Sequence, residues 1–333
     1  MNEHQTYLID IPENPPKNRF PILVQLGVLM LILAGLFSGL FFSKGSETTV
    51  AMNENKAQYP TDTNTYPIAA TIQKFDDVTV RAKAAYVWDV RAQRALYDKN
   101  GEESLPLASI TKLMTAILAH ELIDETDKTT VPLSAVQQEG SSGLSAGEKL
   151  NIKSLLELAL ISSSNDAAFA LGASVGKLLG DNDPTTQFIQ GMNIRAEELN
   201  LNSLKFKSTT GLDLSPTEPG AVGSAKDISF LMEYIVNNYP ELISETQNET
   251  MRVYNATGEY HDIDNTNEIV KRIPNLIGSK TGYTDLAGGN LTIAFNAGFN
   301  RPIIITVLGS TREERFSDVL RLVNAVQNSV SSE

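Results

Sequence analysis

The stretch LASITKLMTA, Leu107 to Ala116, places a serine and a lysine three residues apart at the front of an apolar helical pattern. The apolar spacing predicts a helix that runs to about Leu122. Positions i and i+3 share one face of a helix, so Ser109 and Lys112 can approach each other. The rest of the folded chain is best understood from this pair.

A serine and a lysine at this spacing can act as a nucleophile and its base. The serine hydroxyl attacks weakly until a base removes its proton, and lysine can be that base when burial or a nearby cation lowers its pKa. The pattern is weak alone, since the chain has a second copy at Ser174 and Lys177 and most copies are solvated helix faces. Ser109 differs because it follows LPLA at a loop-to-helix junction, where the helix dipole and a free N–H favour a developing oxyanion.

A second segment, Ser163 to Asn165, lies where one helical pattern ends and the next begins. The hydroxyl of Ser163 can relay a proton, and the amide of Asn165 can hold a peptide carbonyl or N–H. The alternative is a serine-rich linker in which Ser164 or Asn165 caps the next helix.

A third segment, Lys280 to Gly282, is the only K-[ST]-G of the chain and ends an expected strand. Lys280 provides a cation for a carboxylate and can also lower the pKa of Lys112. Thr281 adds a hydroxyl, and Gly282 removes a side chain where a substrate backbone could lie along the strand edge. Taken alone, the segment is equally compatible with a strand that turns into a loop.

Strand patterns occur at both ends of the folded region and helical patterns dominate its middle. We expect strands at Ala84–Val90, Arg94–Asn100, Leu276–Thr281, Asn290–Asn296 and Pro302–Leu308. We expect helices at Ile152–Ile161, Ala167–Leu179, Gln187–Leu199, Lys226–Asn237 and Glu313–Gln327, with start signals at Asp183–Pro184 and Ser224. The fold class is therefore α/β in the α+β sense. It has a mostly antiparallel five-stranded sheet formed by both ends of the domain, flanked by helices, with an inserted all-helical subdomain.

The N-terminal region predicts a membrane anchor. Residues 20–42 carry no charge, and a helix of this length spans about 35 Å, enough to cross the hydrocarbon core. The run is longer than the apolar part of a signal peptide and lacks a clear A-x-A site after it, so we favour an uncleaved helix. Lys17 and Arg19 place the N-terminus in the cytoplasm. We expect a cytoplasmic tail at 1–19, the anchor at 20–42, a flexible linker at 43–76 and an extracytoplasmic domain at 77–330.

Composition excludes several classes of function. The net charge of −13 argues against nucleic-acid binding, which requires a basic face. The chain has no cysteine, which excludes disulfides and thiolate–zinc sites. Its three histidines, His4, His120 and His261, are too scattered for a convincing metal cluster, so we expect no metal and no cofactor.

The three segments in this order resemble the set described for penicillin-binding proteins and class A β-lactamases. LPLASITKLMTA, ISSSNDAA, GMNIRAEELNL, STTGLD and IGSKTGYTDLAGGNL extend the resemblance to the D-alanyl-D-alanine carboxypeptidases, the low-molecular-weight penicillin-binding proteins, over about residues 78–328. Ser164 stands where that family often has glycine, a position expected to contribute mainly backbone. The turn Val90–Arg94 lacks the glycine common there. Many relatives also have an extra β-rich domain and a C-terminal anchor, so we expect the N-terminal helix to be the tether here.

The resemblance implies a β-lactamase/transpeptidase-like fold and a serine peptidase mechanism. Ser109 would attack the bond between two D-alanines of a peptidoglycan stem peptide, and Lys112 would take its proton. Ser163 would pass a proton to the leaving nitrogen. The backbone N–H groups of Ser109 and Tyr283 would form the oxyanion hole. The substrate-binding residues implied are Asn165, Lys280, Thr281, Gly282 and Tyr283.

The same resemblance implies that β-lactams acylate Ser109 and that the enzyme works at the bacterial cell membrane, on the cell-wall side. A D,D-endopeptidase shares every motif and remains open. A serine β-lactamase is less favoured, because Ala196 occupies the position of the water-activating glutamate, while Glu197 and Glu198 are out of register. A non-catalytic wall-binding module is disfavoured by the intact Ser109 and its two lysines.

Two interpretations that assign a role to a histidine are less favoured. A Ser-His-Asp protease is disfavoured because His120 lies near the far end of the helix that follows Ser109. The segment His261–Asp264 could be read as a metal motif, but a polar surface loop is the favoured interpretation.

Overall fold

The computed structural model describes Phe75 and residues 78–140, 143–180 and 182–330. The expected cytoplasmic tail and membrane anchor, and the expected linker apart from Phe75, lie outside these residues. Within the described ranges, none of the helices is both long enough and apolar enough to cross a membrane.

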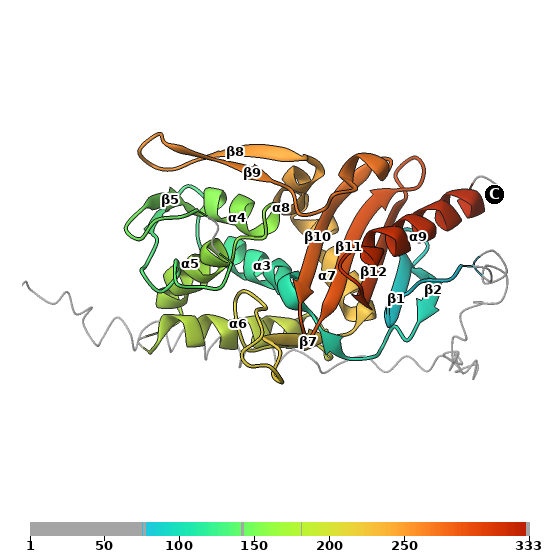
Figure 1. Cartoon of the computed structure of the whole chain (residues 1–333), viewed down its shortest axis with the longest axis horizontal. Coiled ribbons are helices and arrows are strands. Elements are labelled where there is room, and N and C mark those ends of the chain that lie inside the picture. Colours follow the sequence, from blue (N-terminus) through green and yellow to red (C-terminus); the bar gives the residue numbers. More distant parts are fainter. Residues whose placement is uncertain (1–74, 76–77, 141–142, 181, 331–333) are drawn as a thin grey trace, which may run out of the picture. The chain divides into compact units, whose positions relative to one another are not determined.

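The main element is a five-stranded antiparallel sheet built from both ends of the domain (Figure 1). Its strand order is β10-β11-β12-β1-β2, so the last three strands of the chain lie beside the first two. The pairing of Ala84 with Leu308 and of Asp89 with Ile303 joins the two ends. The strands are β1 (Ala84–Asp89), β2 (Arg94–Lys99), β10 (Leu276–Thr284), β11 (Gly288–Asn296) and β12 (Pro302–Ser310). The prediction of this sheet is confirmed, with β10, β11 and β12 longer than expected.

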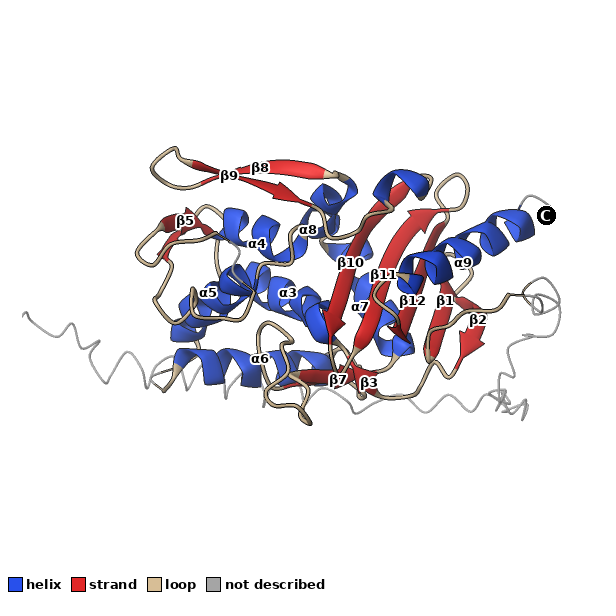
Figure 2. Ribbon diagram, in the orientation of Figure 1, coloured by secondary structure: helices blue, strands red, loops and turns tan. Residues whose placement is uncertain are grey.

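The central strands are buried on both faces because helices cover both sides of the sheet (Figure 2). Alternate residues of a strand point to opposite faces. On β12, Ile304 and Leu308 belong to the core shared with α7 (Ala225–Asn238). Ile305 and Val307 belong to a second core, shared with α9 (Glu314–Val330). This arrangement leaves β10 at one edge of the sheet, beside the segment that carries Ser109.

The region inserted between β2 and β10 is mainly helical, as expected. Its helices are α3 (Lys112–Leu122), α4 (Ile152–Leu160), α5 (Asn165–Val175), α6 (Pro184–Glu198), α7 and α8 (Pro240–Ser244). Asp183 and Ser224 cap α6 and α7 by accepting hydrogen bonds from Thr186 N and Asp227 N, which confirms the two expected start signals.

The expectation that this inserted region is entirely helical is wrong in detail. It also contains short antiparallel pairings, which are β4 (Lys128–Thr130) with β5 (Lys149–Asn151), β7 (Ala221–Gly223) with β3 (Leu105–Pro106) and β6 (Lys205–Phe206), and the hairpin β8 (Thr250–Tyr254) with β9 (Tyr260–Asp264). Most of these strands have only two or three residues, too few for an alternation to stand out in the sequence. In β8 and β9 the alternation is weak, because only one residue of each strand is buried.

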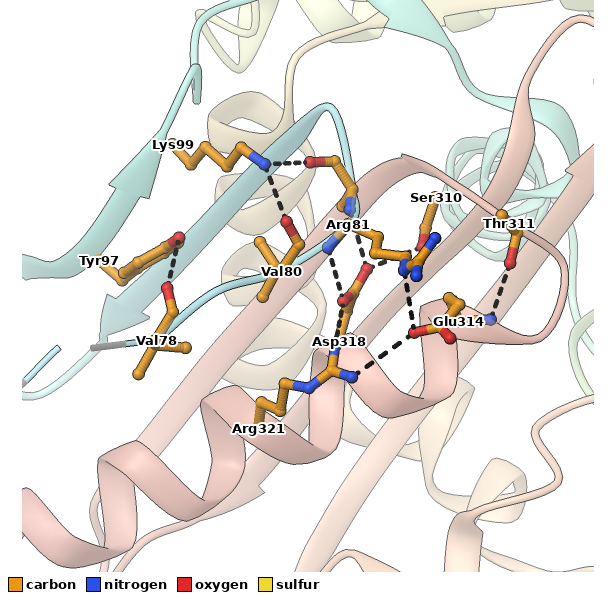
Figure 3. Close-up of polar contacts among 11 residues, drawn as sticks. Val78, Val80, Arg81, Tyr97, Lys99, Ser310, Thr311, Glu314, Asp318 and Arg321 are labelled. Carbon is orange, nitrogen blue, oxygen red and sulfur yellow. Dashed lines mark hydrogen bonds and ion pairs between the residues drawn. The ribbon is translucent and has the colours of Figure 1, made fainter. Parts of the chain in front are cut away.

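The first described segment is fastened to the domain by a buried carboxylate (Figure 3). Asp318 on α9 is fully buried and accepts hydrogen bonds from Arg81 N, Ala82 N and the Ser310 hydroxyl, at 2.8, 2.9 and 2.7 Å. Lys99 donates to the carbonyl oxygens of Val80 and Ala82 from the other side. The backbone that leads into β1 is therefore held between β2 and α9.

Candidate active site

Ser109 lies in the 3-10 helix η1 (Ala108–Thr111), one turn before α3 begins at Lys112. The expected helix is present, but its α-helical part starts later than predicted. Ala108 adopts a φ of +49°, a left-handed conformation that is costly for alanine. The Thr111 hydroxyl donates to Ala108 O at 2.7 Å and helps to hold this conformation. The turn thus fixes the backbone of Ser109 at the edge of the sheet.

Lys112 is completely buried, and its Nζ lies 2.8 Å from Ser109 Oγ. Its other two neighbours are carbonyl-type oxygens, Asn165 Oδ1 at 2.7 Å and Thr210 O at 2.9 Å. Both of these oxygens can only accept hydrogen bonds. In the neutral amine they take the two N–H groups, so the lone pair is directed at the hydroxyl of Ser109.

The electrostatics favour that neutral amine. Burial lowers the pKa of Lys112 well below its ordinary value, and the charge of Lys280 lowers it further. Lys280 thus contributes to the lowered pKa of Lys112 in the expected direction, although burial is the larger cause.

Asn165 opens α5 and connects Lys112 to a neighbouring loop. Its Oδ1 accepts from Lys112, while its Nδ2 donates to Glu139 O at 2.7 Å. Ser164 caps α5 by accepting from Ala167 N at 2.9 Å. The expectation that position 164 contributes mainly backbone is thus wrong, because its hydroxyl satisfies a helix N–H.

Ser163 and Lys280 form a second polar contact of the site. Ser163 has a φ of +61°, and its hydroxyl accepts a hydrogen bond of 2.9 Å from Lys280 Nζ. Lys280 is buried on β10, and burial lowers its pKa to about 7, with a further contribution from the charge of Arg315. The two lysines therefore have different polar partners, Ser109 and Ser163, within one site.

The last two residues of the third segment serve the fold as well. Thr281 is buried, and its hydroxyl shares a hydrogen bond with the hydroxyl of Thr266. A Cβ on Gly282 would lie 2.8 Å from Leu107 O and 3.2 Å from Ser109 N. The space left by Gly282 is therefore taken by the chain's own backbone rather than kept for a substrate, which corrects the expected reason for this glycine. The following residue, Tyr283, is 44% exposed at the edge of β10.

Two residues that the sequence did not indicate complete the site. Arg315 on α9 is buried and donates from Nη1 to Gly282 O at 2.9 Å. Asn290 on β11 donates from Nδ2 to Pro106 O and Leu107 O, both at 3.0 Å, and so fastens the loop before Ser109 to the sheet. Arg315 was detectable in principle, because it precedes Val319 by four residues on the apolar side of α9.

The other candidates lie outside the site. The Ser174 hydroxyl of the second S-x-x-K copy is engaged with Thr129, and Lys177 is exposed. His120 pairs with Glu125 and Glu241. Among the residues that the structure describes, no three His, Cys, Asp or Glu side chains gather as they would to hold a metal.

His261 lies in β9 and pairs with Glu148 at 2.7 Å. The favoured interpretation of its segment as a surface loop is therefore wrong. The segment is one strand of a hairpin, with residues 262 and 264 exposed.

The fold and this site together define a member of the penicillin-binding protein class. The structure resembles that of penicillin-binding protein D2 from Listeria monocytogenes in its ampicillin-bound form, with a TM-score of 0.62, 28% identity, and coverage of 75% of this chain and 98% of that one. It also resembles the Streptomyces K15 DD-transpeptidase in fold, with a TM-score of 0.66, 24% identity, and coverage of 74% of this chain and 98% of that chain.

The chain belongs to the D-alanyl-D-alanine carboxypeptidase family, whose model matches residues 69–312. It is 30% identical to the D-alanyl-D-alanine carboxypeptidase DacF of Bacillus subtilis over 258 residues, which cover 76% of this chain and 64% of the relative. It is 27% identical to a D-alanyl-D-alanine endopeptidase of Escherichia coli over 250 residues, 73% of this chain and 76% of that relative. The chain thus spans just under two thirds of the length of DacF.

Proposed function

We propose that this protein is a serine D-alanyl-D-alanine carboxypeptidase that removes the terminal D-alanine from peptidoglycan stem peptides through an acyl-enzyme on Ser109. The observation that carries the proposal is the placement of Lys112 Nζ, which lies 2.8 Å from Ser109 Oγ and has carbonyl-type oxygens as its other two partners. This arrangement places a neutral amine beside the serine hydroxyl. The amine can act as the base, so the site needs no histidine.

In the proposed acylation step, Ser109 Oγ forms a bond to the carbonyl carbon between the two D-alanines while Lys112 takes the hydroxyl proton. The backbone N–H groups of Ser109 and Tyr283 receive the developing oxyanion. When the carbonyl re-forms, the C–N bond breaks and D-alanine leaves, with its nitrogen protonated by Ser163, whose oxygen accepts from Lys280. Water then hydrolyses the ester and releases the shortened peptide. β-Lactams acylate Ser109 as mimics of the same substrate.

The terminal carboxylate of the substrate binds on the Lys280 side of the nucleophile. Lys280 and Thr281 supply a cation and a hydroxyl there, and the buried guanidinium of Arg315 adds positive charge next to Gly282 O. Asn165 orients the peptide bond through its amide. This concentration of buried cations supports a substrate with a free carboxylate next to the scissile bond.

The geometry of α6 disfavours the β-lactamase alternative. Ala196 is buried, so no carboxylate replaces the missing glutamate at that position. Glu197 lies 3.6 Å from Lys205, and Glu198 pairs with Arg195 at 2.8 Å. Fast hydrolysis of a penicillin acyl-enzyme needs a group that activates water, and these two glutamates have other partners.

The direct test is to incubate the full chain with a peptide that ends in D-Ala-D-Ala and to measure the released D-alanine, with penicillin turnover measured in parallel. We expect D-alanine release and slow penicillin turnover. Rapid penicillin hydrolysis without D-alanine release would favour the β-lactamase. Cleavage of cross-linked dimers without release of terminal D-alanine would favour the endopeptidase.

The KM for the peptide should depend on pH through Lys280. Its pKa is lowered to about 7, so its charge is lost as pH rises through that value, while the substrate carboxylate stays ionised. If only the protonated lysine binds the carboxylate, KM rises about tenfold per pH unit above the pKa. A Lys280→Arg variant, whose guanidinium stays protonated, should lose this dependence. A wild-type KM that is constant from about pH 6 to about pH 9 would contradict this role of Lys280.

We also propose that residues 20–42 anchor the enzyme as a single-pass helix, with the N-terminus in the cytoplasm and the catalytic domain (77–330) on the cell-wall side of a linker at 43–76. The support is the uncharged run and the basic residues before it. Full-length protein that stays in the soluble fraction after cell lysis would contradict the anchor.

A further inference from the structure

Three segments meet at the end of the five-stranded sheet that lies opposite to the active site. We call this the distal end, and it consists of the β1–β2 turn (90–94), the segment before β10 (270–275) and the β11–β12 turn (297–301). The β1–β2 turn is joined to β12 by a hydrogen bond of 3.1 Å from Val90 N to Pro302 O. The other two segments meet where Asn296 N donates to Asn275 O at 3.0 Å. Along β10, at about 3.3 Å per residue, Tyr283 lies about 25 Å from Asn275.

The distal end is basic in a chain whose net charge is −13. Its three segments contain no aspartate or glutamate, and their basic residues are Arg91, Arg94, Lys271, Arg272 and Arg301. Arg91 and Arg272 are exposed, and their side chains make no ion pair with other residues that the structure describes. These two guanidinium groups are therefore available to an anion from outside the chain.

Acidic residues that contact the distal end do not cancel its charge. The buried Asp89 is paired with Arg301 at 2.9 Å, and Glu249 is paired with Lys271. Glu233 on α7 accepts a hydrogen bond of 2.6 Å from the β1–β2 turn. The balance of charge at the distal end stays positive.

The distal end also has a protruding aromatic side chain. Phe299, in the β11–β12 turn, is 97% exposed, and the residues on either side of it are exposed too. An aromatic ring beside basic groups suits the interface of an anionic membrane, where the ring can enter the boundary between headgroups and acyl chains. Guanidinium groups bind the phosphates of the headgroups.

The first described segment approaches the domain from the distal end. Lys99 Nζ donates to Val80 O at 2.9 Å, while the ring of Phe75, earlier in the chain, lies 6.0 Å from the ring of Tyr97. Strand β2 begins at the distal end and passes Tyr97 before Lys99, so the chain comes from that end. A flexible linker as long as the one proposed at 43–76 spans about 30 Å on average, which keeps the distal end near the proposed anchor.

We propose that the distal end docks on the anionic lipid headgroups of the membrane that anchors the chain. Phe299 enters the interface, and Arg91 and Arg272 bind phosphate groups. The inference rests on the proposed anchor and adds an orientation to it, because the active site then faces away from the membrane at a height of about 25 Å. Since the linker raises the local concentration of the domain at the membrane, a weak affinity of the distal end is sufficient.

The test uses the full-length enzyme, which has no cysteine, so that a fluorescent label on one introduced cysteine reports a single position. Ala92→Cys places the label in the β1–β2 turn, and Thr217→Cys places it in an exposed loop at the active-site end. Each protein is reconstituted into vesicles with nitroxide-labelled headgroups, made of phosphatidylcholine with or without phosphatidylglycerol. We expect strong quenching at position 92 in the anionic vesicles only, weakened by high salt, and little quenching at position 217 in either.

Replacing Arg91 and Arg272 with glutamine should weaken docking about fivefold per residue and thereby reduce the quenching at position 92. The matched control replaces two exposed lysines of the inserted region, Lys128 and Lys177, with glutamine. It changes the net charge equally and should leave the quenching unchanged. Phe299→Ser should reduce the quenching, because the apolar contact with the interface is lost.

Equal quenching at the two labelled positions, equal quenching in the two kinds of vesicle, or unchanged quenching in the double glutamine variant overturns the docking surface. A wild type that does not float with anionic vesicles overturns both the surface and the anchor. Acylation by a fluorescent penicillin is measured in the same samples. Acylation without quenching overturns the surface alone, whereas quenching without acylation supports the surface and contradicts the proposed catalytic function.

Discussion

Replacing Lys112 with methionine is expected to lower the rate of acylation by a fluorescent penicillin by about 10²–10⁴-fold, the range typical for the loss of a general base. Methionine keeps the side-chain bulk within the core but has no amine to take the Ser109 proton. Lys112 is completely buried, so no base from the solvent can take its place. The second-order rate constant of labelling measures the effect.

The chain offers a matched control for this experiment. Lys177, in the second S-x-x-K copy, is exposed, and the serine of that copy bonds to Thr129. The Lys177→Met variant should be acylated by penicillin at the wild-type rate. A cooperative urea transition in both variants shows that they fold. A folded Lys112→Met variant that acylates within a few-fold of the wild-type rate would contradict the role of Lys112 as base.

The second large effect is expected from Gly211→Ala, because Gly211 packs against the backbone of the turn that carries Ser109. Gly211 has a φ of +80°, and a Cβ there would lie 1.9 Å from Ala108 O and 2.6 Å from Thr111 Oγ1. The added methyl must push the backbone just before Ser109, or displace Thr210, whose carbonyl holds Lys112. We expect a loss of about 4 kcal/mol in the free energy of unfolding, together with loss of acylation.

Gly258→Ala separates the clash from the cost of the backbone conformation. Gly258 has a φ of +92°, but a Cβ there would meet nothing within 4 Å. This variant should lose only about 1–2 kcal/mol, the cost of a left-handed alanine, and should acylate normally. Urea denaturation measures the free energy of unfolding of both variants. Similar losses for the two would show that close packing of Gly211 against the Ser109 turn is not important.

The five-stranded sheet could be predicted because its strands carry local signals. The residues of β1, β11 and β12 are mostly apolar and buried, and runs of this kind indicate strands wherever they pack. The hairpin β8–β9 was missed because only Val253 and Ile263 in it are buried. Its stability comes partly from Arg252, which pairs with Asp262 across the hairpin and stacks over the ring of Tyr260, and such polar pairs leave no apolar pattern.

In the candidate site, too, features that depend on neighbouring residues could be predicted, and features that depend on residues distant in sequence could not. Ser109, Lys112 and Lys280 stand in short motifs and could be found by their spacing. The left-handed backbone of Ala108 could not, because alanine rarely adopts it. Its carbonyl also packs against Gly211, which is distant in sequence. Asn290 reaches Leu107 across 183 positions of sequence, so only the folded sheet brings the two together.

The most direct test of the account is the intact mass of the full-length protein after incubation with benzylpenicillin, followed by peptide mapping. We expect the wild type to gain the mass of one penicillin on the peptide that contains Ser109, and Ser109→Ala to gain none. An unmodified wild type, or an adduct that persists in Ser109→Ala, would contradict the assignment of Ser109 as the nucleophile.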